Sequence, residues 1–120
     1  MSTAFSDVEV QFLTSGVKAL ARIATVGKDG LPHVVPSGWT YNAELDTLDV
    51  TGRDVELTKK YRDVLRNRRA AVVIDGVDNR AGWSPWAVEV RGQAEAIPGP
   101  PALIRIHPTQ VRSWGLERLA

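Results

Sequence analysis

The residues of this sequence best suited to chemistry form a short basic stretch, Thr58-Lys59-Lys60. Thr58 has the hydroxyl that a helix N-cap needs, and the apolar residues that follow keep the one-face spacing of a helix. Lys59 and Lys60 then fall in the first turn, where unpaired backbone N–H groups and the helix dipole favour negative charge. Lysine destabilises a helix there but holds an anion well. We therefore predict an anion site formed by these three residues.

The charge of the surrounding stretch supports this interpretation. Residues 53–69 contain seven basic and three acidic side chains, a local excess of +4, whereas the whole chain carries +1. For Arg62, Arg66 and Arg68 the solvated face of a surface helix is the simpler explanation. A basic helix on a small β-barrel is also compatible with nucleic-acid binding. The near-neutral net charge disfavours that alternative and also disfavours a membrane-surface binder.

Other catalytic chemistries find little support in the sequence. The chain has no cysteine, which excludes a thiolate nucleophile and a zinc ribbon. Its two histidines, His33 and His107, lie outside any metal-ligand spacing, so we expect no metal site. There is no nucleophile elbow, Walker A loop or Gly-x-Gly-x-x-Gly fingerprint, and Ser37 shares a strand face with His33 through strand periodicity alone. Asp46 and Asp49 stand beside turns and are expected to be solvated.

The residues that precede the basic helix in the sequence are predicted to form β-strands, and these strands must position the helix. Residues 20–26 and 33–41 are rich in β-formers and are joined by a Lys-Asp-Gly turn, which predicts a β-hairpin. Pro32 and Pro36 interrupt the second of these strands and indicate an edge or a bulge. Residues 47–52 then form a third strand that leads to the helix. Before all of these, Ser6 and Glu9 have the spacing of a capping box, which predicts a short helix from Asp7 to about residue 15.

Further strands follow the basic helix. Residues 70–75 are almost wholly apolar, which predicts a strand buried on both faces, and residues 75–82 form a surface loop. Residues 86–96 alternate between apolar and polar side chains, which predicts a long strand with one core face. The Pro-Gly-Pro-Pro corner at 98–101 leads to two short strands, 102–107 and 111–116, on either side of Pro108.

Six or seven strands with few helices predict a mainly β fold, a small antiparallel barrel in which closure removes the exposed edges. The 120 residues fit one domain, 1–120, which is small for a self-contained cofactor enzyme unless two subunits share the site. The first residues lack a signal-peptide pattern, and no apolar run approaches the length of a membrane span. We therefore expect a cytoplasmic protein.

Five segments, in order and spacing, resemble the pyridoxamine-phosphate-oxidase-like split β-barrel flavoproteins. They are 24–36 (ATVGKDGLPHVVP), 58–64 (TKKYRDV), 67–75 (NRRAAVVID), 88–92 (VEVRG) and 106–116 (IHPTQVRSWGL). The last segment resembles most closely the branch of actinobacterial enzymes thought to use the deazaflavin coenzyme F420. The resemblance covers nearly the whole chain.

This resemblance implies a split β-barrel homodimer with a phosphorylated flavin-type cofactor at each of two interface sites. Coenzyme F420 is the first choice, with FMN as the alternative. The implied cofactor-binding residues are Val35, Pro36 and Ser37 at the ring, Thr51 and Gly52 along the ribityl-phosphate path, Thr58, Lys59 and Lys60 at the phosphate, and Arg91 and Trp114 toward the partner's cofactor.

The expected reaction is hydride transfer from the deazaflavin to an unsaturated organic acceptor, for which no catalytic side chain is identified. The oxidase itself has an arginine on the second strand and Gln-Val-Arg on the long strand, where this chain has Val35 and Ala87-Val88-Glu89. Pyridoxamine phosphate oxidase activity is therefore not expected, and FMN is the second choice. A flavin or tetrapyrrole carrier without turnover, built on the same barrel, is the remaining alternative.

Overall fold

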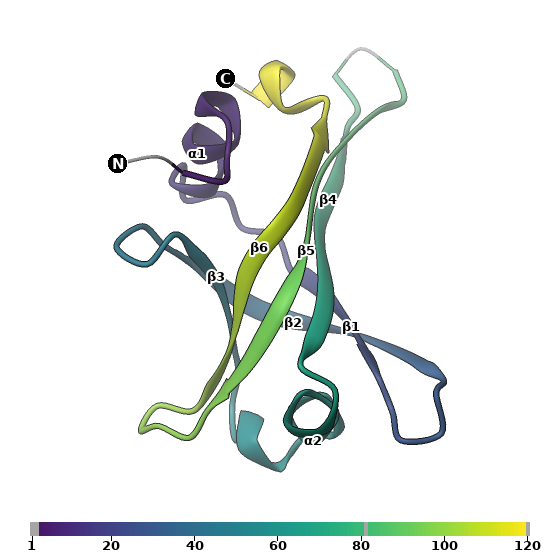
Figure 1. Ribbon diagram of the computed structural model, residues 1–120. Coiled ribbons are helices and arrows are strands. Elements are labelled where there is room, and N and C mark those ends of the chain that lie inside the picture. The colour runs from purple at the N-terminus through teal and green to yellow at the C-terminus, as the bar shows by residue number, and fades with distance from the viewer. Residues whose placement is uncertain (1–2, 81, 120) are drawn as a thin grey trace.

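The computed structural model describes residues 3–80 and 82–119 and has a mainly β architecture, a closed six-stranded barrel (Figure 1). Its strands are β1 (Ala21–Val26), β2 (Pro32–Asn42), β3 (Thr47–Thr51), β4 (Arg69–Asp78), β5 (Ser84–Ile97) and β6 (Leu103–Trp114). They close in the order β1-β2-β3-β6-β5-β4, and the pairings are antiparallel. This confirms the predicted fold class.

Helices lie at both ends of the barrel (Figure 1). At one end is α2 (Lys59–Arg66), which the chain reaches through the 3-10 turn η1 (Val55–Leu57). At the other end are α1 (Asp7–Leu13) and the 3-10 turn η2 (Leu116–Leu119). None of the helices in the described part of the chain is long and apolar enough to cross a membrane.

The core fills the barrel from alternate positions of its strands. Ile23, Val72 and Val90 lie in register on three neighbouring strands and are buried. Phe12 of α1 packs against Trp86 of β5 with the ring centroids 5.2 Å apart, which extends the core to the α1 end. Full burial of one aliphatic side chain contributes about 1.5–3 kcal/mol, so this repeated alternation stabilises the closed barrel.

The prediction that residues 70–75 are buried on both faces is wrong. Val72 and Ile74 of β4 are buried, but Ala71 and Val73 point to the other face and are half-exposed. The strand also runs on to Asp78, so the first half of the predicted loop at 75–82 is strand, and residue 81 of that loop lies outside the described residues. The apolar run therefore gives β4 an uncovered apolar outer face within the single chain.

The prediction of two short final strands is also wrong, because β6 is continuous through Pro108. Its pairing with β5 shifts register between Arg91 and Gly92, which forms a β-bulge. A Cβ atom on Gly92 would lie 1.9 Å from the carbonyl oxygen of His107, so only glycine allows the two strands to approach this closely. The bulge accommodates Pro108, which has no N–H to give to a regular ladder.

The prolines of β2 lie in a half-paired part of the strand, as an edge position predicts. Residues 32–37 pair with β1, and β2 then changes partner, so that residues 38–42 pair with β3. Pro32 and Pro36 both belong to the first half, where β3 has no recorded pairing among the residues described. The two prolines, which have no N–H group, therefore remove few hydrogen bonds from the pairing of β2.

The expectation that Asp46 and Asp49 are solvated is wrong for Asp49, whereas Asp46 is half-exposed. Asp49 is 4% exposed and accepts hydrogen bonds from the Arg105 guanidinium, the shorter one being 3.1 Å. Asp46 accepts a hydrogen bond from the Tyr41 hydroxyl at 2.9 Å and from Thr3 at 2.6 Å. Both carboxylates are structural, since one joins β3 to β6 and the other ties the N-terminal segment to the β2–β3 turn.

Candidate functional site

Thr58 begins α2 as the sequence predicts. Its backbone is extended, and its hydroxyl oxygen accepts a hydrogen bond from the Tyr61 N–H at 3.4 Å. The same hydroxyl donates to the carbonyl of Val55 at 2.6 Å, which joins η1 to the start of the helix. Thr58 is thus a confirmed N-cap, and the orientation of the first helical turn is fixed by two contacts of a single side chain.

Lys59 lies at the surface and is paired. Its ammonium lies 3.0 and 3.1 Å from the two carboxylate oxygens of Asp63, one turn further along α2. The ammonium also rests against the backbone of Gly27, where a Cβ atom would come within 2.8 Å of Nζ. Asp63 was not among the predicted site residues, although its i,i+4 spacing from Lys59 was the available signal.

Asp63 is the buried centre of this arrangement, with a side chain only 3% exposed. Thr25 of β1 donates its hydroxyl hydrogen to Asp63 Oδ2 at 2.8 Å. Burial raises the pKa of the Asp63 carboxyl, but the hydrogen bonds from Lys59 and Thr25 outweigh burial, and the pKa is lowered overall. Asp63 is therefore ionised at neutral pH and holds Lys59 in one place.

Lys60 has a different environment from its neighbour. The residue is only 9% exposed, and burial lowers the pKa of its ammonium. Burial is the single cause of that shift, and no carboxylate of the described residues forms an ion pair with Lys60. A cation on a largely buried residue without a counter-charge is only partly solvated, so an anion that reaches Lys60 would bind with more than surface strength.

Thr51 and Gly52, which were assigned to the ribityl-phosphate path, lie where β2 leaves β1, next to Ser37, which was assigned to the ring. The Ser37 hydroxyl donates to the Thr51 carbonyl at 2.7 Å, which joins β2 to the end of β3. A Cβ atom on Gly38 would lie 3.2 Å from the Thr51 hydroxyl oxygen, so a side chain there would crowd this junction. From Thr51 the chain passes through Gly52 and η1 to Thr58. Backbone connectivity thus links this junction to the basic helix.

The two residues before Ser37 face opposite sides of β2. Val35 pairs with the buried Ile23 and packs against the core, whereas Pro36 pairs with the exposed Arg22 and is itself exposed. A planar ring therefore cannot contact both side chains from one face. Any ring bound along this strand would lie against the backbone or against one set of alternate side chains.

Next to Lys59 lies a basic cavity of about 340 Å³. It is lined by Lys28, Asp29, Lys59, Arg62, Asp63 and Arg66. Four of these side chains are cationic and two are anionic, so the lining carries a formal charge of +2. An anion in this cavity would meet complementary charge along the side of α2, and Lys60 is not among the lining residues.

Arg91 lies on the outer face of the barrel, apart from the basic helix. It bonds to Gln110 of β6 and lines a cavity of about 530 Å³ together with Arg69. The outer face beside it is apolar, because Ala24 and Ala71 lie in register with Arg91 on the neighbouring strands. Arg69 gave no separate signal in the sequence, since it was one of seven basic residues in its stretch.

Trp114 lies at the other end of β6, opposite Ala87 and next to η2. Its side chain is 53% exposed, so it is not a core residue. Because the strand alternates, Trp114 points to the same outer face as Gln110 and, through the pairing of β5 with β6, as Arg91. The structure thus brings Arg91 and Trp114 to one outer face but does not bring them to Lys59 and Lys60 within one chain.

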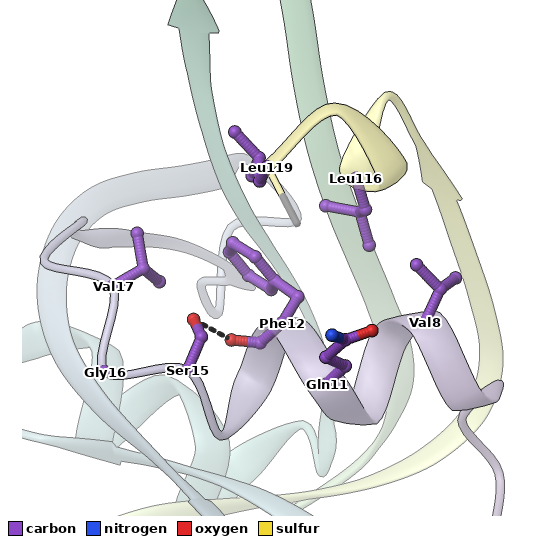
Figure 2. A pocket seen from close by; sticks show the side chains of 8 residues that line it. All are labelled: Val8, Gln11, Phe12, Ser15, Gly16, Val17, Leu116 and Leu119. Carbon is purple, nitrogen blue, oxygen red and sulfur yellow. Dashed lines mark hydrogen bonds between the residues drawn. The ribbon is translucent and has the colours of Figure 1, made fainter.

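A third cavity, of about 350 Å³, lies at the α1 end of the molecule. Figure 2 shows its lining side chains, which come from α1, the segment after it and η2: Val8, Gln11, Phe12, Ser15, Gly16, Val17, Leu116 and Leu119. None of these side chains is charged, and the Ser15 hydroxyl is already bonded to the Phe12 carbonyl at 2.6 Å. This cavity does not suit a phosphate.

Comparison with known proteins gives a family and a relative. The family model described as pyridoxamine 5'-phosphate oxidase matches residues 17–115. The relative is a 5a,11a-dehydrotetracycline/5a,11a-dehydrooxytetracycline reductase of Streptomyces rimosus subsp. rimosus, 35% identical over 122 residues that cover 94% of this chain and 84% of the relative. Both matches indicate an oxidoreductase.

Solved structures share the fold. The FAD binding protein of Mycobacterium smegmatis aligns with a TM-score of 0.66 and 23% identity, covering 93% of this chain and 96% of that chain. An F420 reductase aligns with a TM-score of 0.59 and 21% identity, covering 78% of this chain and 89% of that chain. At these identities the likeness concerns the fold. The family model and the reductase relative each match most of this chain. The chain therefore belongs to the pyridoxamine 5'-phosphate oxidase family.

Proposed function

We propose that this protein is a coenzyme F420-dependent reductase that transfers a hydride to an unsaturated organic acceptor, with FMN as the alternative cofactor. The observation that carries the proposal is Lys60, a largely buried residue at the capped start of α2 whose ammonium has no carboxylate partner among the described residues. A cofactor phosphate supplies the missing charge. The match to an F420 reductase fold and to a reductase relative supports the choice of cofactor and reaction.

The residues of this chain have defined roles in the proposal. Thr58 orients the first turn of α2, and Lys59 and Lys60 bind the phosphate with backbone N–H groups of that turn. Ser37 and Thr51 hold the junction along which the ribityl chain lies. When bound, the reduced deazaflavin supplies the hydride, and the protein contributes orientation and exclusion of water, while solvent supplies the proton.

The relative suggests the class of acceptor. The relative's name describes the reduction of a 5a,11a-dehydro compound, that is, a carbon–carbon double bond in a polycyclic tetracycline. We propose that the acceptor is a carbon–carbon double bond conjugated with a carbonyl group, because the carbonyl withdraws electrons from the β-carbon and makes that carbon an acceptor of hydride. The physiological acceptor is a small molecule of this kind.

A homodimer is part of the same proposal. The outer face of β1, β4 and β5 is half-exposed and apolar at Ala24, Ala71 and Val73, and the cavity beside it carries Arg69 and Arg91. A partner packed on this face would cover the apolar surface and bring Arg91 near the second subunit's cofactor. The proposed location is the cytoplasm, which cell fractionation would check.

The experiment is a titration of purified protein with F420 and, separately, with FMN, followed by fluorescence polarisation. F420 is expected to bind more tightly. Changing Lys59 and Lys60 together to Ala should weaken binding by about 2–4 kcal/mol, since both make charge-assisted bonds to the phosphate. Lys18→Ala, at an exposed lysine outside the basic stretch, is the matched control and should bind as the unmodified protein does.

Turnover is tested separately from binding. Under anaerobic conditions, reduced F420 should be oxidised when a 5a,11a-dehydrotetracycline or a simpler cyclic enone is added, and should remain reduced when acceptor is omitted. Tight F420 binding without oxidation by any enone would favour the carrier alternative. Failure to bind either cofactor would remove the proposal.

A further inference from the structure

One buried polar atom near the basic helix is not used by the proposed function. The Nδ1 atom of His33 is buried and has no hydrogen-bond partner among the described residues. It lies 4.0 Å from Oδ2 of Asp63, the carboxylate that holds Lys59. His33 pairs across the β1–β2 hairpin with Thr25, which bonds to the same Oδ2 atom at 2.8 Å. The imidazole is therefore a neighbour of the ion pair without being bonded to it.

The charge of this cluster depends on His33. With a neutral imidazole, the positive charge of Lys59 and the negative charge of Asp63 cancel, so the cluster has a net charge of zero. Protonation of His33 places a second cation beside Asp63 and raises the net charge to +1. The other charged groups that line the cavity beside Lys59 and Asp63 are Lys28 and Asp29 of the hairpin turn and Arg62 and Arg66 of α2.

We propose that anion binding at Lys59 is coupled to protonation of His33. In the protonated state Nδ1–H faces Asp63 and shares its negative charge, so that more of the Lys59 charge is available to a phosphate-type dianion. A bound dianion in turn favours the proton on His33, because the two effects are reciprocal. This inference rests on the proposed function, since it takes Lys59 to be an anion contact.

The coupling makes a regulatory prediction about the site. The affinity for a dianion should fall as pH rises through the range in which an imidazole titrates, by about 3- to 10-fold in total at moderate salt. Sulfate is the probe, because its charge stays constant over that range, whereas phosphate itself titrates. Binding is followed by amide chemical shifts of residues near Lys59, from about pH 5 to about pH 8.

Two variants separate the coupling from the site. His33→Gln keeps a polar side chain that cannot titrate, and its sulfate affinity should be independent of pH. His107→Gln is the matched control: it removes the chain's other imidazole, which pairs with Glu95 at 3.0 Å, and should keep the full pH dependence. A pH dependence retained in His33→Gln would overturn the coupling.

The proposed anion site can fail independently. Lys59→Met should weaken sulfate binding about 10-fold at every pH, and unchanged sulfate affinity in that variant would remove the anion site itself. If His33→Gln does not fold, the unmodified protein still gives an answer through its imidazole NMR signals. Saturating sulfate should raise the titration midpoint of His33 and leave that of His107 in place, and an unmoved His33 midpoint would overturn the coupling.

Discussion

Lys60 is expected to lower the stability of the free protein and to raise its affinity for the cofactor. The residue is largely buried and its ammonium has no counter-charge in the described part of the chain, so the partial burial destabilises the free protein at neutral pH. Lys60→Met should therefore raise the free energy of unfolding without cofactor by up to about 1 kcal/mol, while cofactor affinity falls by about 1.5–3 kcal/mol. Urea unfolding and fluorescence polarisation measure the two effects.

The exposed Arg68→Met is the control for this prediction, because it removes a cation next to the helix without removing a buried one. Neither its stability nor its cofactor affinity should change by more than about 0.5 kcal/mol. A Lys60→Met protein that loses stability and keeps its affinity would show that the ammonium serves an internal contact instead.

Asp63 makes the stability of the protein sensitive to acid. Its pKa is lowered in the folded state, so its contribution is present above the unfolded value of about 3.9 and is lost as pH falls through the lower folded value. Asp63→Asn should cost about 1–3 kcal/mol at pH 7, and the difference from the unmodified protein should shrink below about pH 4. Urea unfolding at several pH values gives this curve.

Asp29→Asn provides the comparison for Asp63, since Asp29 is an exposed carboxylate lining the same cavity. Its effect on unfolding should be small and nearly independent of pH. An Asp63→Asn difference that stays constant down to the acid limit would mean that Asp63 contributes through shape and not through charge.

Local sequence signals predicted part of the candidate site and could not predict the rest. Thr58 as N-cap and two lysines in the first turn follow from helix chemistry, which acts over a few residues. The burial of Lys60 and the contact of Thr25 with Asp63 depend on how β1 packs against α2, over 38 residues of sequence separation. No local pattern contains that information.

At the scale of elements, α1 is attached by one glutamate that serves two purposes. Glu9 accepts the Ser6 N–H at 2.8 Å, which completes the predicted capping box, and its other oxygen accepts the Ser113 hydroxyl of β6 at 2.5 Å. Ser113→Ala would leave a buried carboxylate oxygen unpaired, so we expect a loss of about 1–3 kcal/mol and faster hydrogen exchange in α1. Ser15→Ala, which removes an exposed hydroxyl after α1, should have little effect.

The elements that the sequence predicted well are those with local signals. The β1–β2 hairpin and the alternation of β5 appear as expected, because turn chemistry and period-two patterning determine them. The continuity of β6 was missed because Pro108 is tolerated only where Gly92, on another strand, admits the bulge. The exposed outer face of β4 was missed because composition does not distinguish two cases. An apolar strand has the same composition whether its outer face is buried by the same chain or by a partner.

At the scale of the whole molecule, the barrel separates the proposed cofactor contacts onto two surfaces. The phosphate residues lie at the α2 end, whereas Arg91 and Trp114 lie on the outer face of β5 and β6. One chain therefore does not bring all of the implied contacts together. A second copy packed on the outer face would do so, and this makes the proposed homodimer a requirement of the proposed site.

Ala71 tests that requirement at the centre of the apolar outer face, where it lies in register between Ala24 and Arg91. Ala71→Glu replaces a methyl group with a long side chain in the proposed interface, where a partner could no longer pack closely, so the protein should become a monomer and bind F420 at least about 10-fold more weakly. Light scattering after size-exclusion chromatography gives the mass. Leu45→Glu, at a residue 51% exposed in the β2–β3 turn, should remain dimeric and bind normally. A monomeric Ala71→Glu protein with unchanged F420 affinity would mean that each barrel holds its cofactor alone, and Arg91 and Trp114 would then have no part in the site.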